Sequence, residues 1–152
     1  MSDQDHIYMS AALEEAKMAA GRGEVPIGAV LVDAATGEIV ARLGNNTITA
    51  CDPTAHAEIL TIRQQCQTVK AQRIPQYDMY VTLEPCAMCA AAIAFARIRK
   101  LVIGALDEKS GGVFHGGKFF DQATCHHKII IEHGVMADEC GQILKDFFAA
   151  RR

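Results

Sequence analysis

The spacing of hydrophobic residues along the chain changes several times between that of a helix and that of a strand. Near the start, apolar residues that include Ile7 recur at helical spacing over residues 5–21, and Gly21 and Gly23 end this predicted helix. The stretch VPIGAVLVDAATGEIVARLGNN, residues 25–46, contains two β-rich runs around an Ala-Thr-Gly turn. We therefore expect a helix followed by an antiparallel hairpin.

The rest of the chain alternates helices with strands. The expected elements are a helix that opens at Asp-Pro-Thr (52–54), a strand over 78–83, an alanine-rich helix from Pro85 to about Arg97, a buried strand in KLVIGAL (100–106), a strand in KIIIEHGV (128–135) and a helix over 136–150. The glycine-rich stretch from Asp107 to His127 is too long for an ordinary connection, so it is either functional or carries a short helix. This alternation predicts one α/β domain over residues 1–152, layered around a mixed sheet.

Composition narrows the location more than the function. The 152 residues are half hydrophobic and 22% charged, an ordinary balance for one globular domain. No apolar run approaches the roughly 20 residues of a membrane span, and the acidic start MSDQDHIYMS lacks the basic segment of a signal peptide. We therefore expect a cytoplasmic protein with no membrane contact. The net charge of −3 argues against a surface that binds nucleic acid everywhere, but it is compatible with a local basic patch.

Six cysteines raise the question of a metal site, because a cytoplasmic chain is not expected to pair them in disulfides. Only Cys86 and Cys89 have ligand spacing, whereas Cys66 and Cys140 are expected to pack in helices as small hydrophobic residues. At a helix start, the dipole and free N–H groups favour thiolates. His56, from the earlier helix, completes a set of three ligands. Three protein ligands plus water is the arrangement of a catalytic zinc, so we expect one zinc ion per chain.

Two other metal arrangements stay open from the residues alone. A fourth protein ligand, for which Cys51 is a candidate, would close the site and make it structural. Cys125, His126 and His127 could hold a second metal ion, or they could form a folded loop whose imidazoles hydrogen-bond to the backbone.

Glu58 separates a catalytic metal from a structural one. It lies two residues after His56, at the first turn of the predicted helix, where both side chains can reach a cavity at the helix end. A glutamate there that is not a ligand can take a proton from zinc-bound water and return it to the substrate. Alone, Glu58 would be interpreted as a charge that complements the helix dipole. Beside the three ligands, it predicts a catalytic site.

His56-Ala57-Glu58 followed by Pro85-Cys86-Ala87-Met88-Cys89 matches the H-x-E…P-C-x-x-C signature of the zinc nucleobase deaminases. The segments EVPIGAVLV, DPTAHAEI, YVTLEPCAMCAAAI, ARIRKLVIGA and ADECGQILKDFF extend the likeness, and the chain resembles the bacterial tRNA adenosine deaminases along nearly its whole length. The resemblance implies a cytidine deaminase-like three-layer α/β/α sandwich with a central mixed five-stranded sheet. It also implies a homodimer, and an activity that converts the wobble adenosine in the anticodon loop of an arginine tRNA to inosine.

The same resemblance assigns roles to individual residues. His56, Cys86 and Cys89 would hold zinc, and Glu58 would transfer protons. Asn45 would hydrogen-bond the target nucleotide and Val25 would help to wall the base pocket. The implied anticodon-loop contacts are Asp107, Lys109, Ser110, Phe147, Phe148 and Arg151. Within the long loop, VFHGGKFF and TCHH depart from the pattern that many family members carry.

Two rival functions belong to different classes. A small-molecule deaminase of the same fold would act on guanine, cytosine or a nucleoside, and the acidic composition favours it slightly. The C-terminal FFAARR and the run Arg97, Arg99 and Lys100 favour RNA, because they can supply stacking and phosphate contacts; charges of this kind also occur on ordinary solvated faces. A zinc-stabilised binding module is the third possibility, and Glu58 and the missing fourth ligand argue against it.

Overall fold

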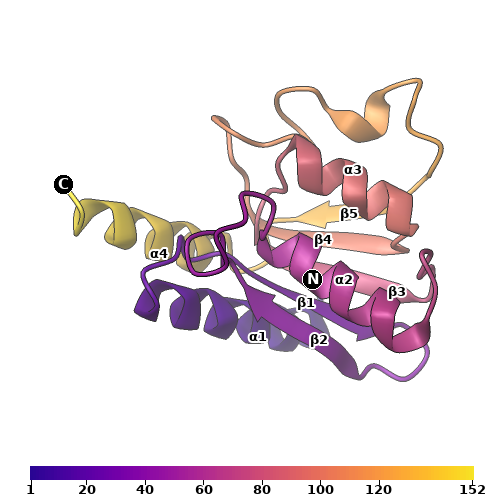
Figure 1. Cartoon of the computed structure of the whole chain (residues 1–152), viewed down its shortest axis with the longest axis horizontal. Coiled ribbons are helices and arrows are strands. Elements are labelled where there is room, and N and C mark those ends of the chain that lie inside the picture. The colour runs from indigo at the N-terminus through magenta and orange to yellow at the C-terminus, as the bar shows by residue number, and fades with distance from the viewer.

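The computed structural model describes residues 1–152 and contains a five-stranded sheet between two layers of helices (Figure 1). The elements are α1 (Asp3–Gly21), β1 (Gly28–Asp33), β2 (Ile39–Gly44), α2 (Ala57–Val69), β3 (Tyr77–Leu83), α3 (Ala87–Ala96), β4 (Lys100–Ala105), the 3₁₀ helix η1 (Phe119–Asp121), β5 (Ile130–His133) and α4 (Ala137–Ala149). The strand order is β2-β1-β3-β4-β5, in which β1 is antiparallel to β2 and β3, and β4 is parallel to β3 and β5. The predicted mixed three-layer sandwich is confirmed.

Strand alternation divides the core in two. Successive side chains of a strand point to opposite faces, so β1, β3 and β4 each contribute side chains to the core on both faces of the sheet. On one face, Leu31, Met79 and Leu101 pack with residues of α2 and α3, which include Ala57 and Ile93. On the other face, β1, β3 and β4 pack with α1 and α4 through residues that include Val30, Tyr80, Val102, Met9 and Cys140. The helices over the first face, α2 and α3, are the two that the sequence associates with metal ligands.

Several element boundaries differ from the sequence prediction. Helix α1 begins at Asp3 because Ser2 and Asp5 form a capping box, and Ile7 is 56% exposed instead of joining the core stripe. The expected helix start at residues 52–54 is instead a turn, in which Asp52 Oδ1 accepts hydrogen bonds from the N–H and hydroxyl of Thr54. Helix α2 therefore begins at Ala57.

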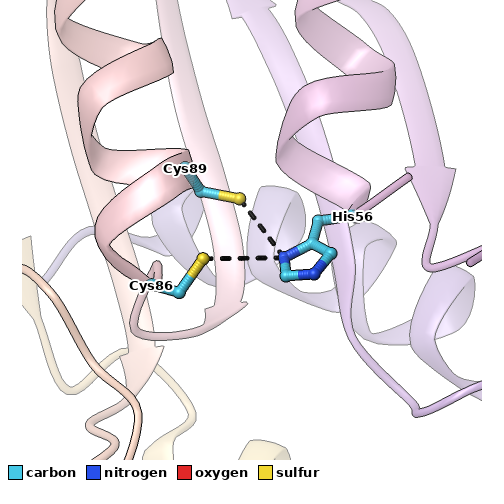
Figure 2. A group of neighbouring side chains, drawn as sticks. All are labelled: His56, Cys86 and Cys89. Carbon is cyan, nitrogen blue, oxygen red and sulfur yellow. Dashed lines mark hydrogen bonds between the residues drawn. The ribbon is translucent and has the colours of Figure 1, made fainter. Parts of the chain in front are cut away.

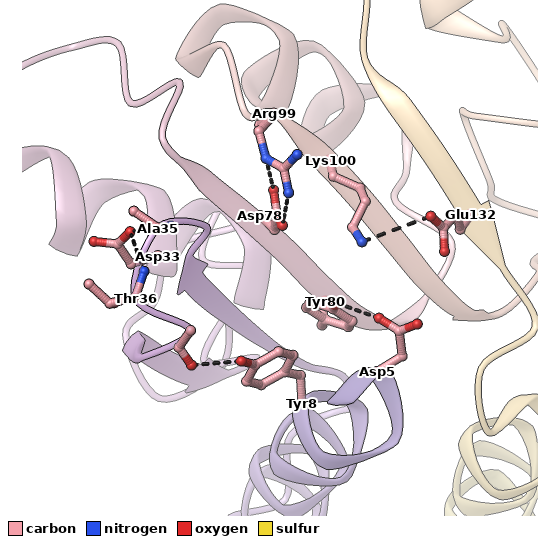
Figure 3. A network of polar contacts seen from close by, with 11 residues as sticks. Asp5, Tyr8, Asp33, Ala35, Thr36, Asp78, Tyr80, Arg99, Lys100 and Glu132 are labelled. Atoms are coloured by element: carbon pink, nitrogen blue, oxygen red, sulfur yellow. Dashed lines mark hydrogen bonds and ion pairs between the residues drawn. The ribbon is translucent and has the colours of Figure 1, made fainter. Parts of the chain in front are cut away.

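Polar contacts join α1 to the sheet on the face away from the metal ligands (Figure 3). The Tyr80 hydroxyl donates to Asp5 Oδ1 at 2.6 Å, and the Tyr8 hydroxyl donates to the Gly37 carbonyl at 2.6 Å. Asp5 thus serves both the helix cap and a buried strand residue. These hydrogen bonds join α1 to β3 and to the turn between β1 and β2.

The side chains of Arg97, Arg99 and Lys100, which could supply RNA contacts, bind other groups of the protein. The Arg99 guanidinium donates to both carboxylate oxygens of Asp78, at 2.8 and 2.6 Å, and Lys100 Nζ lies 3.8 Å from Glu132 Oε1 (Figure 3). Arg97 donates to the Ala94 carbonyl at the end of α3. These residues lie where β4 begins, at the opposite end of the strand from Asp107. The Arg99 and Lys100 side chains are therefore paired with carboxylates at this end of the sheet, away from Asp107, and their contact with RNA stays a prediction.

The loop from Asp107 to His127 carries the short helix η1, which is one of the two features that the sequence led us to expect there. In its second half, the His127 ring nitrogen Nε2 lies 2.6 Å from the Ile98 carbonyl, and Cys125 Sγ lies 3.4 Å from the His127 carbonyl. These contacts match a folded loop tied to the backbone. The one group of His, Cys, Asp and Glu side chains placed to share a metal ion is His56, Cys86 and Cys89.

None of the helices is both long and apolar enough to cross a membrane.

Candidate active site

Two helices on the same face of the sheet begin at the same place (Figure 2). His56 is the N-cap residue of α2 and Cys86 is the N-cap residue of α3, and neither side chain makes a capping hydrogen bond. Cys89 follows one turn into α3. Pro85 therefore precedes the N-cap, whereas the sequence had suggested the first helical position for it. The positive ends of two helix dipoles meet at this point, which favours negative charge there.

The three side chains have the spacing of metal ligands. His56 Nδ1 lies 3.4 Å from Cys89 Sγ and 3.7 Å from Cys86 Sγ, and all three ligand atoms lie within 4.8 Å of one another (Figure 2). Tetrahedral zinc with Zn–S of about 2.3 Å and Zn–N of about 2.0 Å places its nitrogen and sulfur ligands about 3.6 Å apart. The observed distances bracket that value, so the residues present fit zinc.

Protonation of the two thiols is unequal. Hydrogen bonds from Cys89 and His56 outweigh burial and lower the pKa of Cys86 to about 4. Cys89 donates its proton to Cys86 and is buried, and both effects raise the pKa of Cys89. The hydrogen bond with Cys86, partly opposed by burial, raises the pKa of His56. These contacts favour the thiolate of Cys86, and the thiolate is the form that binds metal.

Glu58 occupies the second position of α2, beside the ligand group. The residue is 3% exposed and its carboxyl group lies close to Cys89. Burial is the main cause that raises the pKa of Glu58 to about 7, since the charged form loses its hydration. A carboxyl group with such a pKa can both accept and release a proton near neutral pH.

Asn45 connects the ligand group to the cavity above it. Its side-chain oxygen accepts a hydrogen bond from Ala57 N at 2.9 Å, and its backbone carbonyl accepts one from Arg22 at 3.1 Å. With the oxygen committed to the first N–H of α2, the two amide hydrogens of Asn45 are the groups left for a ligand. Asn45 thereby also serves the helix start that His56 leaves uncapped.

A cavity of about 790 Å³ opens over this group. It is lined by Val25, Ile27, Asn45, Thr47, His56, Leu83, Asp107, Lys109, Ser110, Leu144, Phe148, Arg151 and Arg152. The structure therefore brings together seven of the eight residues expected to bind substrate, along with His56. They come from the β1 entry, the β2–α2 loop, the long loop after β4 and the end of α4, which no local pattern in the sequence relates.

Phe147 is the expected substrate residue that the structure places elsewhere. It is 8% exposed, does not line the cavity, and has the Arg151 guanidinium carbon 3.4 Å from its ring centroid. Phe148 is 46% exposed and meets Phe147 edge-on, with ring centroids 5.3 Å apart. Phe147 thus supports Phe148 and Arg151 from below.

Sequence reasoning missed five residues of the lining: Ile27, Thr47, Leu83, Leu144 and Arg152. Each is near a predicted residue in sequence, but apolar residues in strands and helices carry no signal that separates a cavity wall from a core position. Position at the carboxyl end of a central strand, as for Leu83, is the cue that was available.

The arrangement combines a three-ligand metal group with an open face, a buried carboxyl group beside it and a cavity with aromatic and basic walls. Such a site can hold an activated water next to a proton carrier, under a pocket that accepts a planar ring.

Comparisons with known proteins agree with this chemistry. Residues 2–105 match the family described as the cytidine and deoxycytidylate deaminase zinc-binding region. The tRNA-specific adenosine deaminase of Agrobacterium fabrum is 51% identical over 152 residues, which cover 100% of this chain and 98% of that protein. A structure solved in studies of A-to-I editing by tRNA:A34 deaminases at the wobble position of transfer RNA superposes with a TM-score of 0.88 at 52% identity, covering 91% of this chain and 99% of the other.

More distant structures share the fold alone. Guanine deaminase from Nitrosomonas europaea superposes with a TM-score of 0.82 at 18% identity, covering 95% of this chain and 84% of that one. The match of the family model over most of the chain, and of a relative over all of it, settles the family. The chain belongs to the zinc-dependent cytidine and deoxycytidylate deaminase family, and the relative that it matches over its full length is a tRNA-specific adenosine deaminase.

Proposed function

We propose that this enzyme hydrolyses adenosine to inosine at the wobble position of a tRNA, with an arginine tRNA as the substrate. The observation that carries the proposal is the position of Glu58 beside His56, Cys86 and Cys89, below a cavity whose walls include Phe148 and Arg151. The similarity to proteins named for this activity supports the choice of substrate.

In this proposal His56 Nδ1 and the sulfurs of Cys86 and Cys89 hold one zinc ion per chain. Zinc bound there would supply a water molecule whose pKa is lowered to about 7. The three ligands come from two helices that are separate in sequence, so each must be held by packing on the sheet. The positive ends of the α2 and α3 dipoles favour the two thiolates.

Glu58 moves the protons. It takes one from the attacking water and delivers it to the adenine ring nitrogen next to C6, and a second transfer converts the exocyclic amine to ammonia as its bond to C6 breaks. The raised pKa of Glu58 suits this work, because the group must be a base in one step and an acid in the next. Water enters and ammonia leaves, so the reaction needs no other reactant.

The cavity walls hold the nucleotide. The amide hydrogens of Asn45 donate to it, Val25 walls the base, and Asp107, Lys109 and Ser110 contact the neighbouring loop nucleotides. Phe148 offers an exposed ring for base stacking, and Arg151 offers a charge for phosphate. An anticodon loop displays unstacked bases, so a pocket can take one base without melting a stem.

We also propose a homodimer, formed through the outer face of α3. That face presents Ala87, Met88, Ala91 and Ala92, which allow close approach, and Phe95, which is 70% exposed. Phe95→Asp should therefore shift a dimer toward monomer in sedimentation at micromolar concentration, and a wild-type monomer under those conditions would refute this part of the proposal.

We also propose a cytoplasmic location, because the proposed substrate is a tRNA.

One observation favours the rival, a deaminase of a free base or nucleoside. Arg99 and Lys100 are paired with Asp78 and Glu132 away from the cavity, so this run adds no positive charge at the site. The remaining cations at the cavity are Lys109, Arg151 and Arg152.

The deciding experiment compares substrates directly. The zinc-loaded enzyme is incubated with an anticodon stem-loop that carries a wobble adenosine, with the same stem-loop carrying guanosine, and with free adenosine, adenine, guanine and cytidine. Inosine and ammonia from the first substrate alone are the expected result. Turnover of a free base or nucleoside, with none on the stem-loop, would overturn the RNA assignment.

A further inference from the structure

Glu84 is a fully buried carboxylate that the proposed reaction does not use. Its Oε1 accepts hydrogen bonds from Asp107 N at 3.0 Å and pairs with His115 Nδ1 at 2.8 Å. Its Oε2 accepts from the N–H groups of Val113, Phe114 and His115, at 3.1, 2.9 and 3.2 Å. One side chain at the end of β3 thus gathers five donors from a single loop, the one that follows β4.

The loop is built to approach this carboxylate. A Cβ at Gly111 would stand 2.3 Å from Glu84 Oε2, and one at Gly112 would stand 2.5 Å from Ala87 N in the first turn of α3. Gly112 also donates to the Pro85 carbonyl at 2.8 Å. Only residues without a Cβ fit at these two positions, so the Gly-Gly pair lets the loop wrap around Glu84.

The contacts continue from Glu84 to the cavity rim. Asp107, whose N–H is bound by Glu84, accepts through its own Oδ1 from the N–H groups of Lys109 and Ser110, both at 3.1 Å. Its carbonyl accepts from Gly111 N at 3.0 Å. Asp107, Lys109 and Ser110 all line the cavity. Two successive sets of hydrogen bonds therefore connect a buried carboxylate to three rim residues.

We propose that Glu84 is a positioning residue for substrate binding: by holding the loop over residues 107–115, it fixes the turn that carries Asp107, Lys109 and Ser110 against the nucleotide. Glu84 does not line the cavity, so it acts through the loop. His115 is its side-chain partner, and it lies in the part of the loop that departs from the family pattern. The assignment rests on the proposed function, because it takes the rim turn to be a substrate contact.

Glu84→Gln is the first test. An amide nitrogen would replace one carboxylate oxygen and would face N–H groups, which leaves at least one buried donor unpaired. We expect zinc content of one per chain, a KM for the stem-loop that rises about tenfold or more, and a kcat within about threefold of wild type, since the loss is in substrate binding. An unchanged KM, or a loss of zinc and kcat together, would overturn the proposal; the latter would assign Glu84 to support of the neighbouring Cys86.

A matched control separates positioning from stability. Asp5→Asn also replaces a buried carboxylate by an amide, but on the opposite face of the sheet, where Asp5 binds Tyr80. It should lower the thermal midpoint of unfolding and leave KM unchanged. If both variants raised KM equally, the effect of Glu84 would be one of general stability.

Two variants approach the same contact from the loop and keep the test available if Glu84→Gln does not fold. His115→Ala removes the ring contact and should raise KM by about threefold, and Gly111→Ala forces a Cβ against Glu84 Oε2 and should raise it further. The double variant Glu84→Gln/His115→Ala should be less impaired than the two single effects combined, because both act on one contact. Full additivity would contradict a shared mechanism.

Amide hydrogen exchange measures the loop without any substrate. The N–H groups of Asp107, Val113, Phe114 and His115 should exchange slowly in the wild type and roughly tenfold or more faster in Glu84→Gln, with no change in Asp5→Asn. Amides that stay protected in Glu84→Gln would refute the positioning role. A wild type that is inactive on the stem-loop would refute the proposed function and leave this exchange result to stand on its own.

Discussion

Replacing Glu58 by Gln should abolish most turnover and leave the fold and the zinc in place. Gln has the shape of Glu, so the change opens no cavity in a site where the side chain is 3% exposed. It removes a carboxyl group that burial disfavours in its charged form, so it should not lower the free energy of unfolding. The effect is therefore confined to proton transfer.

The expected size follows from that burial. General acid–base catalysis contributes about 10²–10⁴ in rate, and bulk water cannot reach the position of Glu58 to replace it. Several proton transfers depend on the one group, so we expect the upper part of that range. A rate loss of about 10²–10⁴ corresponds to about 2.7–5.4 kcal/mol in the activation barrier.

The assay is inosine formation on the anticodon stem-loop under single-turnover conditions, with zinc measured on the same samples and unfolding followed in denaturant. Glu15→Gln is the control, because Glu15 is also a buried glutamate but lies on α1, where it pairs with Arg42. It should keep the wild-type rate. A Glu58→Gln enzyme that retained more than about a tenth of the wild-type rate would show that Glu58 only complements the dipole of α2.

Three further predictions concern the metal, the RNA contact and the fold. Cys89→Ala should lose zinc and lower the thermal midpoint in a melting curve, because ligands from two helices are no longer tied together. The control Cys140→Ala, which removes a buried thiol in α4, should keep one zinc per chain by metal analysis. Phe148→Ala should weaken stem-loop binding by about 1–3 kcal/mol at every salt concentration. Arg151→Ala should instead reduce the slope of the logarithm of affinity against the logarithm of salt concentration by about 0.7. Binding titrations over a salt series distinguish the two, and a Phe148→Ala effect that vanished at high salt would contradict stacking. Asp5→Asn should lower the free energy of unfolding by about 1–2 kcal/mol at neutral pH. Burial opposes ionisation of Asp5, but hydrogen bonds from Tyr80 and Ser2 prevail and lower its pKa from 3.8. The ionised group therefore stabilises the fold above that pH and loses this effect as the pH falls. The difference in unfolding free energy between wild type and Asp5→Asn should accordingly shrink when denaturation is repeated below about pH 4.

The sequence by itself determined the chemistry of the centre and the layers around it. The H-x-E and P-C-x-x-C motifs identify their ligands because spacing within one helix start is a local property, and the backbone geometry there varies little. The alternation of helices with strands along the chain likewise predicted an α/β domain layered around a mixed sheet, since each element must bury its apolar side against another element.

Tertiary structure decided which residues meet around that centre. Adjacent aromatic residues in α4 have the same local signal, and only packing buries Phe147 and leaves Phe148 at the cavity. The charges of Arg99 and Lys100 suggested RNA until strand pairing placed Asp78 and Glu132 beside them. Glu84 carried no motif of its own, because its four partner residues lie more than twenty residues away along the chain. Contacts of that kind depend on how loops close over the sheet, and this is settled by long-range packing rather than by local periodicity.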